Sequence, residues 1–129
     1  MLALRYRSRW QTAGGVLLVS ALVIALLPDL HLIDLSKPFR LWDKLVHVLA
    51  FAFLTVWFSW QLARQSYWRI AVGLIAFGAL IELIQSMVSY RTAEWMDMYA
   101  DGVGITMGLM VALFGAGGWS VRMEQWLES

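Results

Sequence analysis

Four long apolar stretches, at 13–27, 43–63, 68–88 and 97–117, take up most of this chain of 129 residues. A helix uses roughly 17 to 25 mainly apolar residues to cross a bilayer, and the four stretches lie near or within that range. The chain is 60% hydrophobic, whereas soluble domains have roughly 45 to 50% apolar residues. Lipid excludes water around such helices, so no large core is needed. The sequence predicts an all-α membrane protein with one domain, 1–129, and a bundle of four transmembrane helices.

The first stretch is the shortest and follows the basic residues Arg5, Arg7 and Arg9. A basic start before a short apolar run is also typical of a cleaved signal peptide. No clear small-residue cleavage site follows, and Pro28 would end the helix of a retained anchor, so we expect the segment to be retained. The connection 28–42 receives no predicted secondary structure, and 120–129 is predicted as a polar tail.

Lysine and arginine are unevenly divided between the two faces that four helices would create. The face with both termini would carry Arg5, Arg7, Arg9, Arg64, Arg69 and Arg122, and the opposite face Lys37, Arg40, Lys44 and Arg91. Basic residues favour the cytoplasmic side. We therefore predict that both termini are cytoplasmic and that 28–42 and 89–96 are external. Tryptophans near most of the expected helix ends agree with this arrangement, because tryptophan favours the membrane interface.

Several function classes find no support in the sequence. The chain has no cysteine, which excludes disulfides, thiolate zinc sites and cysteine nucleophiles. No pattern indicates nucleic-acid binding, a glycine-rich phosphate loop or a serine nucleophile with a paired base. The expected partners are membrane lipids.

Polar residues with helical spacing occur in or beside the last three apolar stretches, where lipid makes them costly. They are Asp43, Lys44 and His47 in the second stretch, Glu82 and Gln85 in the third, and Asp97 and Asp101 in the fourth. Residues three or four apart share a helix face. At ~1.5 Å per residue, Glu82 lies roughly 9 Å inside the membrane edge and Asp101 roughly 6 Å. We predict that the three sets meet in one polar pocket at the external ends of their helices.

Structural roles compete with this functional interpretation. Asp43 and Asp97 lie near expected helix starts, where exposed backbone N–H groups and the helix dipole favour a carboxylate. His47 is either a buried, hydrogen-bonded histidine or part of a site. Glu82 either pairs with a basic side chain such as Arg91, or is protonated through desolvation, or binds a metal ion.

Small residues form a row along the fourth stretch. Gly104 and Gly108 make a GxxxG pattern, which Ala100 and Ala112 extend. Such rows let another helix approach closely. The pattern predicts helix packing rather than cofactor binding, and it leaves open whether the packing is within one chain or between chains.

The spaced polar residues and glycines resemble the signature of the VanZ-like family of small bacterial membrane proteins. The matching positions are Asp43, Lys44, His47, Phe51, Glu82, Gln85, Arg91, Asp97, Asp101, Gly104 and Gly108, so the resemblance covers roughly 40–112. It implies a multi-pass protein of the bacterial cytoplasmic membrane, in a family named after a member linked to teicoplanin resistance, and it implies no settled activity. The family often has asparagine at the position of Asp101, and a second acid here favours a cation or a shared proton.

The expected function is that of a cell-envelope factor that binds a lipid-linked or headgroup ligand and affects susceptibility to glycopeptide and other envelope-targeting antibiotics. The residues expected to bind that ligand are Lys44, His47, Glu82, Gln85, Arg91, Asp97 and Asp101. The alternative is an enzyme acting on an ester or phosphoester at the outer leaflet, with His47 as base, Asp43 orienting it, and Glu82 or Asp101 as acid or metal ligand. A proton-coupled exporter and an assembly role are less favoured.

No organic cofactor is expected, and no metal site is assigned, because the chain lacks an established spacing such as HExxH. A divalent cation held by His47 and the carboxylates remains an alternative.

Overall fold

The computed structural model describes residues 4–26, 39–87, 95–116 and 119–129, with side chains at all of these except 39–43, 95 and 116. Five α-helices, a 3-10 turn and a π turn follow one another in this part of the chain, which contains no strand. The elements are α1 (Arg7–Leu26), α2 (Phe39–Ser59), η2 (Arg64–Ser66), α3 (Tyr67–Met87), α4 (Trp95–Val111), η3 (Ala112–Ala116) and α5 (Trp119–Glu128). The all-α prediction is confirmed.

Three helical segments are long and apolar enough to cross a membrane. They are Arg7–Leu26, Arg64–Met87 and Met96–Gly115, with mean hydropathy of 1.5, 2.0 and 1.4. The apolar part of α2, Lys44–Ser59, is shorter. The structure thus has the apolar helices of a membrane protein, while the count of four spans stays a prediction.

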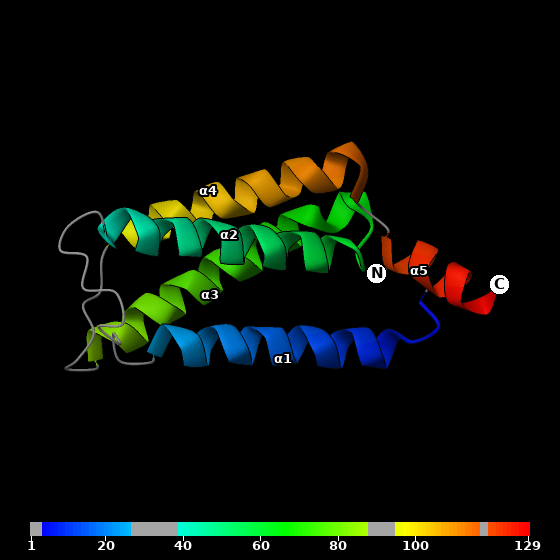
Figure 1. The fold of residues 1–129 in the computed structure, drawn as a ribbon, viewed down its shortest axis with the longest axis horizontal. Helices are drawn as coiled ribbons and strands as arrows, with labels where there is room; N and C mark the ends of the chain where they lie inside the picture. Colours follow the sequence, from blue (N-terminus) through cyan, green and yellow to red (C-terminus); the bar gives the residue numbers. More distant parts are fainter. Residues whose placement is uncertain (1–3, 27–38, 88–94, 117–118) are drawn as a thin grey trace.

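Figure 1 shows how the long helices are arranged. Helices α2 and α4 run side by side, α3 crosses at an angle to them, and α1 lies along the other side of α3. The first described residues and α5 lie at one end of the bundle, whereas the starts of α2 and α4 lie at the other end. The first and the last described residues are therefore at the same end of the bundle.

Two segments differ from the sequence prediction. Helix α2 begins at Phe39, inside the connection that received no secondary structure, and it follows Pro38, a residue favoured around a helix start. Asp43 is therefore the fifth residue of α2 and not its cap. The predicted polar tail is the helix α5, which begins after Gly115 has turned the chain with a φ of 153°, a conformation that glycine adopts readily.

The glycine row packs α4 against α2 of the same chain. A Cβ atom added at Gly104 would contact the backbone oxygen of Val48, and one added at Gly108 would lie 2.7 Å from the backbone oxygen of Ala52. The two backbones can approach this closely only because both positions lack a side chain. In this structure the two glycines contact α2 of the same chain.

Helix α5 is held by a carboxylate that binds the start of α1. Glu124 accepts hydrogen bonds from the backbone N–H groups of Arg5 (2.9 Å) and Tyr6 (3.0 Å) and from the indole N–H of Trp10 (2.9 Å). Arg5 also pairs with Glu128 at 2.8 Å. N–H groups at a helix start lack partners within the helix, so Glu124 satisfies them from outside. We call these five residues the α1–α5 clasp.

We expect Glu124→Gln to weaken the clasp by about 1.5 to 3 kcal/mol, the contribution of hydrogen bonds to a charged group. Burial by itself raises the pKa of the Glu124 carboxyl, but the hydrogen bonds from Arg5, Tyr6 and Trp10 outweigh it and hold the pKa below its usual value of 4.5. The stabilisation is therefore fully present above 4.5 and is lost as the pH falls toward the lowered pKa of the folded state.

Thermal unfolding in detergent at about pH 7 and about pH 3 tests this, because the difference between wild type and Glu124→Gln should shrink in acid. Glu128→Gln is the control, since its partner Arg5 is solvent-exposed and such pairs contribute about 0 to 1 kcal/mol. An unchanged difference at both pH values would contradict the role given to the Glu124 charge.

Candidate functional site

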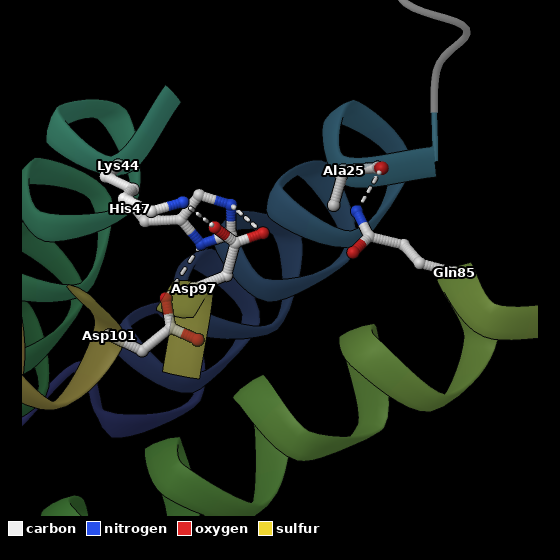
Figure 2. A network of polar contacts seen from close by, with 6 residues as sticks. All are labelled: Ala25, Lys44, His47, Gln85, Asp97 and Asp101. Carbon is white, nitrogen blue, oxygen red and sulfur yellow. Dashed lines mark hydrogen bonds and ion pairs between the residues drawn. The ribbon is translucent and has the colours of Figure 1, made fainter. Parts of the chain in front are cut away.

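Four of the predicted site residues meet between α2 and α4 (Figure 2). Lys44 and His47 come from one face of α2, and Asp97 and Asp101 from one face of α4. Lys44 Nζ lies 3.3 Å from Asp97 Oδ1, His47 Nδ1 lies 2.8 Å from Asp101 Oδ1, and His47 Nε2 lies 3.8 Å from Asp97 Oδ2. We call these four residues the polar cluster.

The polar cluster is largely buried, and its charges are arranged in pairs. The side chains of Asp97 and Asp101 are 5% and 4% exposed, that of His47 12% and that of Lys44 22%. A buried carboxylate is costly unless a cation or donor is bound to it. Lys44 serves Asp97 in this way, and His47 serves Asp101 when its Nδ1 carries the proton.

Helix α3 contributes a close backbone contact to the cluster. A Cβ atom added at Gly78 would lie 2.6 Å from Oδ2 of Asp101. The missing side chain of Gly78 thus leaves the space that the Asp101 carboxylate occupies. The sequence analysis did not predict a role for Gly78, because no glycine lies four residues before or after it.

Gln85 lies on α3 but bonds to α1. Its side chain is 1% exposed, and its amide N–H donates to the backbone oxygen of Ala25 at 2.8 Å. Because Ala25 is in the last turn of α1, this bond satisfies a carbonyl that has no partner within the helix. Figure 2 draws the pair apart from the polar cluster. The other amide atom, Oε1, is buried without a hydrogen-bond partner in the described part of the chain.

Three further predicted residues are not among the four of the polar cluster. Glu82 is half-buried on α3. Arg91 lies outside the described residues, so its pairing with Glu82 stays a prediction. Asp43 lies in α2, but its side chain is outside the described part, so its predicted role in orienting His47 stays a prediction. Asp97 is in the first turn of α4, where the helix dipole favours it.

A cavity of about 310 Å³ lies between α1, α2 and α3, beside the polar cluster. Ligand pockets usually have roughly 300 to 1,000 Å³. Its polar lining residues are His47 and Ser20, and the rest are apolar: Leu17, Ala21, Ile24, Ala25, Val46, Ala50, Phe51, Phe53, Leu54 and Ile81. His47 is therefore both a member of the polar cluster and part of the cavity wall.

The contact between His47 and Asp101 is of the kind found in acid–base chemistry. A carboxylate that accepts from Nδ1–H fixes the tautomer and the orientation of an imidazole, as it does where histidine acts as a general base. Among the described residues, no group of three or more histidine and carboxylate side chains is arranged to hold a metal ion. The divalent cation stays a prediction.

The apolar helices and the buried acid–histidine cluster define a small helical protein of the membrane-embedded class. The chain belongs to the VanZ/LLP1 family, whose sequence model matches residues 3–116. The resemblance is confirmed, and the match also takes in α1, which the motif residues left outside. No curated protein and no solved structure matches the chain.

Proposed function

We propose that this protein binds the polar end of an envelope lipid at the polar cluster, and in this way affects susceptibility to glycopeptide and other envelope-targeting antibiotics. The observation that carries the proposal is the double position of His47. Its ring contacts Asp101 on one side and lines an apolar cavity on the other. An amphiphile has the same two parts, a polar end and a hydrocarbon chain.

The proposed topology has four spans, cytoplasmic termini and an external polar cluster in the bacterial cytoplasmic membrane. The end of the bundle with α5 also holds Arg5, Arg64 and Arg122, and basic residues favour the cytoplasmic side. Lys44 and Asp97 are near the starts of α2 and α4, which lie at the opposite end (Figure 1). This arrangement supports a polar cluster that faces the outer leaflet.

Lys44 is the most exposed member of the cluster and is the expected contact for a phosphate-bearing headgroup. An anionic headgroup competes with Asp97 for the ammonium group. Since the ion pair is 3.3 Å long, the exchange costs less than the loss of a short, fully buried pair would cost.

The test is the thermal midpoint of the purified protein in detergent with added phosphatidylglycerol, phosphatidylethanolamine, phosphatidylcholine or polyprenyl phosphate. A ligand at about 100 times its dissociation constant stabilises the folded state by about 2.7 kcal/mol. We expect one headgroup class to raise the midpoint of wild type, and Lys44→Gln to lose that shift. Arg122→Gln is the matched control, because Arg122 is an exposed cation at the other end.

Three outcomes separate the alternatives. A shift that Arg122→Gln loses as well is unspecific attraction, and it contradicts the proposal. If no lipid shifts wild type, the function lies with a protein partner. The enzyme alternative is favoured by the 2.8 Å His47–Asp101 contact, and it is supported if lipid is converted to product by wild type and not by His47→Ala. In cells, growth at graded teicoplanin concentrations with wild type or Lys44→Gln tests the antibiotic phenotype.

A further inference from the structure

Helix α1 is attached to the rest of the bundle at separate points along its length. Its start is held by the α1–α5 clasp. Gly14 is buried against the rings of Phe58 and Trp57, where an added Cβ atom would lie 2.9 Å from Phe58. Its last turn is held by the bond from Gln85 to Ala25. The cavity beside His47 lies between the second and the third of these attachments.

One face of α1 forms a wall of this cavity. Leu17, Ser20, Ala21 and Ile24 line it, and their spacing of three, four and seven residues places them on one side of the helix. Seven residues of helix correspond to about 10 Å, a third of the roughly 30 Å hydrocarbon layer of a bilayer. On α2 the lining runs from Val46 to Leu54 and has a similar length.

The cavity is closed at its floor and open at its side. Phe51, Leu54 and Ile81 form the floor and are each 3% exposed. Ile24 on α1 and Phe53 on α2 are 65% and 52% exposed. The mouth therefore lies between α1 and α2, on the outer surface of the bundle. If these helices are embedded in a bilayer, the medium at this mouth is hydrocarbon.

The polar and apolar parts of the cavity are separated along its length. His47 lies near the start of α2, at the end of the cavity that Ala25 and Ile24 border. Leu54 is seven residues further along α2 and faces the middle of the bundle. A chain that enters at this mouth can place its polar end by His47 and its apolar end by Leu54 and Leu17.

We propose that the cavity is a lateral binding site for one hydrocarbon chain of a membrane lipid, which enters between α1 and α2 and ends near Leu54. This inference rests on the proposed function and specifies it, because it assigns the chain and the headgroup of one ligand to adjacent places. The Gln85–Ala25 bond closes the external end of the site, and the contact of Gly14 with Phe58 closes the inner end. Both ends are fixed, so the length of the site is defined.

Photo-crosslinking tests the site. The full chain is placed in vesicles of equal parts phosphatidylcholine and phosphatidylglycerol, with a photoreactive diazirine in the acyl chain of the phosphatidylglycerol, and labelled peptides are identified by mass spectrometry. We expect labelling to concentrate on 17–24 and 46–54. Ala50→Phe fills the cavity and should lower this labelling about tenfold, which corresponds to 1.4 kcal/mol of binding free energy.

Controls keep the result interpretable. Ala79→Phe adds the same ring on the exposed side of α3, away from the cavity, and should leave the labelling of 17–24 and 46–54 unchanged. Ala21→Phe fills the cavity from α1 and replaces Ala50→Phe if that variant unfolds. Labelling spread evenly over the exposed faces of α3 and α4, and unaffected by either filling variant, would show only surrounding lipid and overturn the inference.

Failure of this inference is distinguishable from failure of the proposed function. If the cavity is labelled but no headgroup raises the thermal midpoint, the chain site stands and the polar cluster is not a headgroup site. If a headgroup effect depends on Lys44 while the cavity is not labelled, the headgroup site stands and the chain lies elsewhere.

Discussion

Gly104→Ala is expected to destabilise the protein by about 3 kcal/mol or more, the upper range of overpacking in a well-packed core. The added methyl group would contact the backbone oxygen of Val48 and lie 3.1 Å from the backbone nitrogen of Ala52. Backbone atoms cannot rotate away as a side chain can, so α2 and α4 must separate. Their separation also moves Asp101 away from His47.

Gly102→Ala is the matched control, because a Cβ atom at Gly102 has no neighbour within 4 Å. That change should raise stability by roughly 0.5 to 1 kcal/mol, since alanine is the better helix former. Thermal unfolding followed by circular dichroism, together with size-exclusion chromatography, measures both variants. If Gly104→Ala unfolds like wild type but changes the oligomeric state, the glycine row serves a contact between chains.

Asp101→Leu is expected to cost about 3 to 5 kcal/mol, the usual result of removing one partner of a buried pair. Leucine has a branched end like that of aspartate, but it cannot accept the proton of His47 Nδ1–H. Asp101→Asn should keep most of the stability, because its amide oxygen still accepts that hydrogen bond.

A double-mutant cycle measures the contact directly. Once His47→Leu has removed the donor, Asp101→Leu should cost less, and the coupling should be about 0.5 to 3 kcal/mol. Thermal midpoints of wild type, the two single variants and the double variant provide the four corners. Additive effects would mean that His47 and Asp101 do not act as a pair, and both the headgroup site and the enzyme alternative would lose their main support.

The spacing of residues along the chain predicts part of the polar cluster. The sequence predicts that Lys44 and His47 share one helix face and that Asp97 and Asp101 share another. It also predicts that these faces meet. It does not determine that Asp101 contacts His47. The orienting role predicted for Asp43 stays a prediction, because the side chain of Asp43 lies outside the described residues. His47 and Asp101 are 54 residues apart, and their contact depends on how closely α4 approaches α2 at Gly104.

The role of Glu124 was not predicted from the sequence at all. Nothing local distinguishes it from other glutamates of a polar tail, because its partners Arg5 and Tyr6 are 119 and 118 residues away. The one available signal is the spacing of Ser120 and Glu124, which places these two buried residues on one face of α5. That spacing becomes informative only when the segment is known to be helical.

The membrane-type composition, the long helices, the family and the residues of the polar cluster could all be predicted from the order of residues along the chain. Apolar length and helical spacing are local properties, so they can be recognised along the chain without knowledge of the fold. The contact of His47 with Asp101, the docking of α5 and the cavity beside α1 could be found only in the folded chain. These features depend on the distances and angles between helices, which contacts between residues far apart in the chain determine.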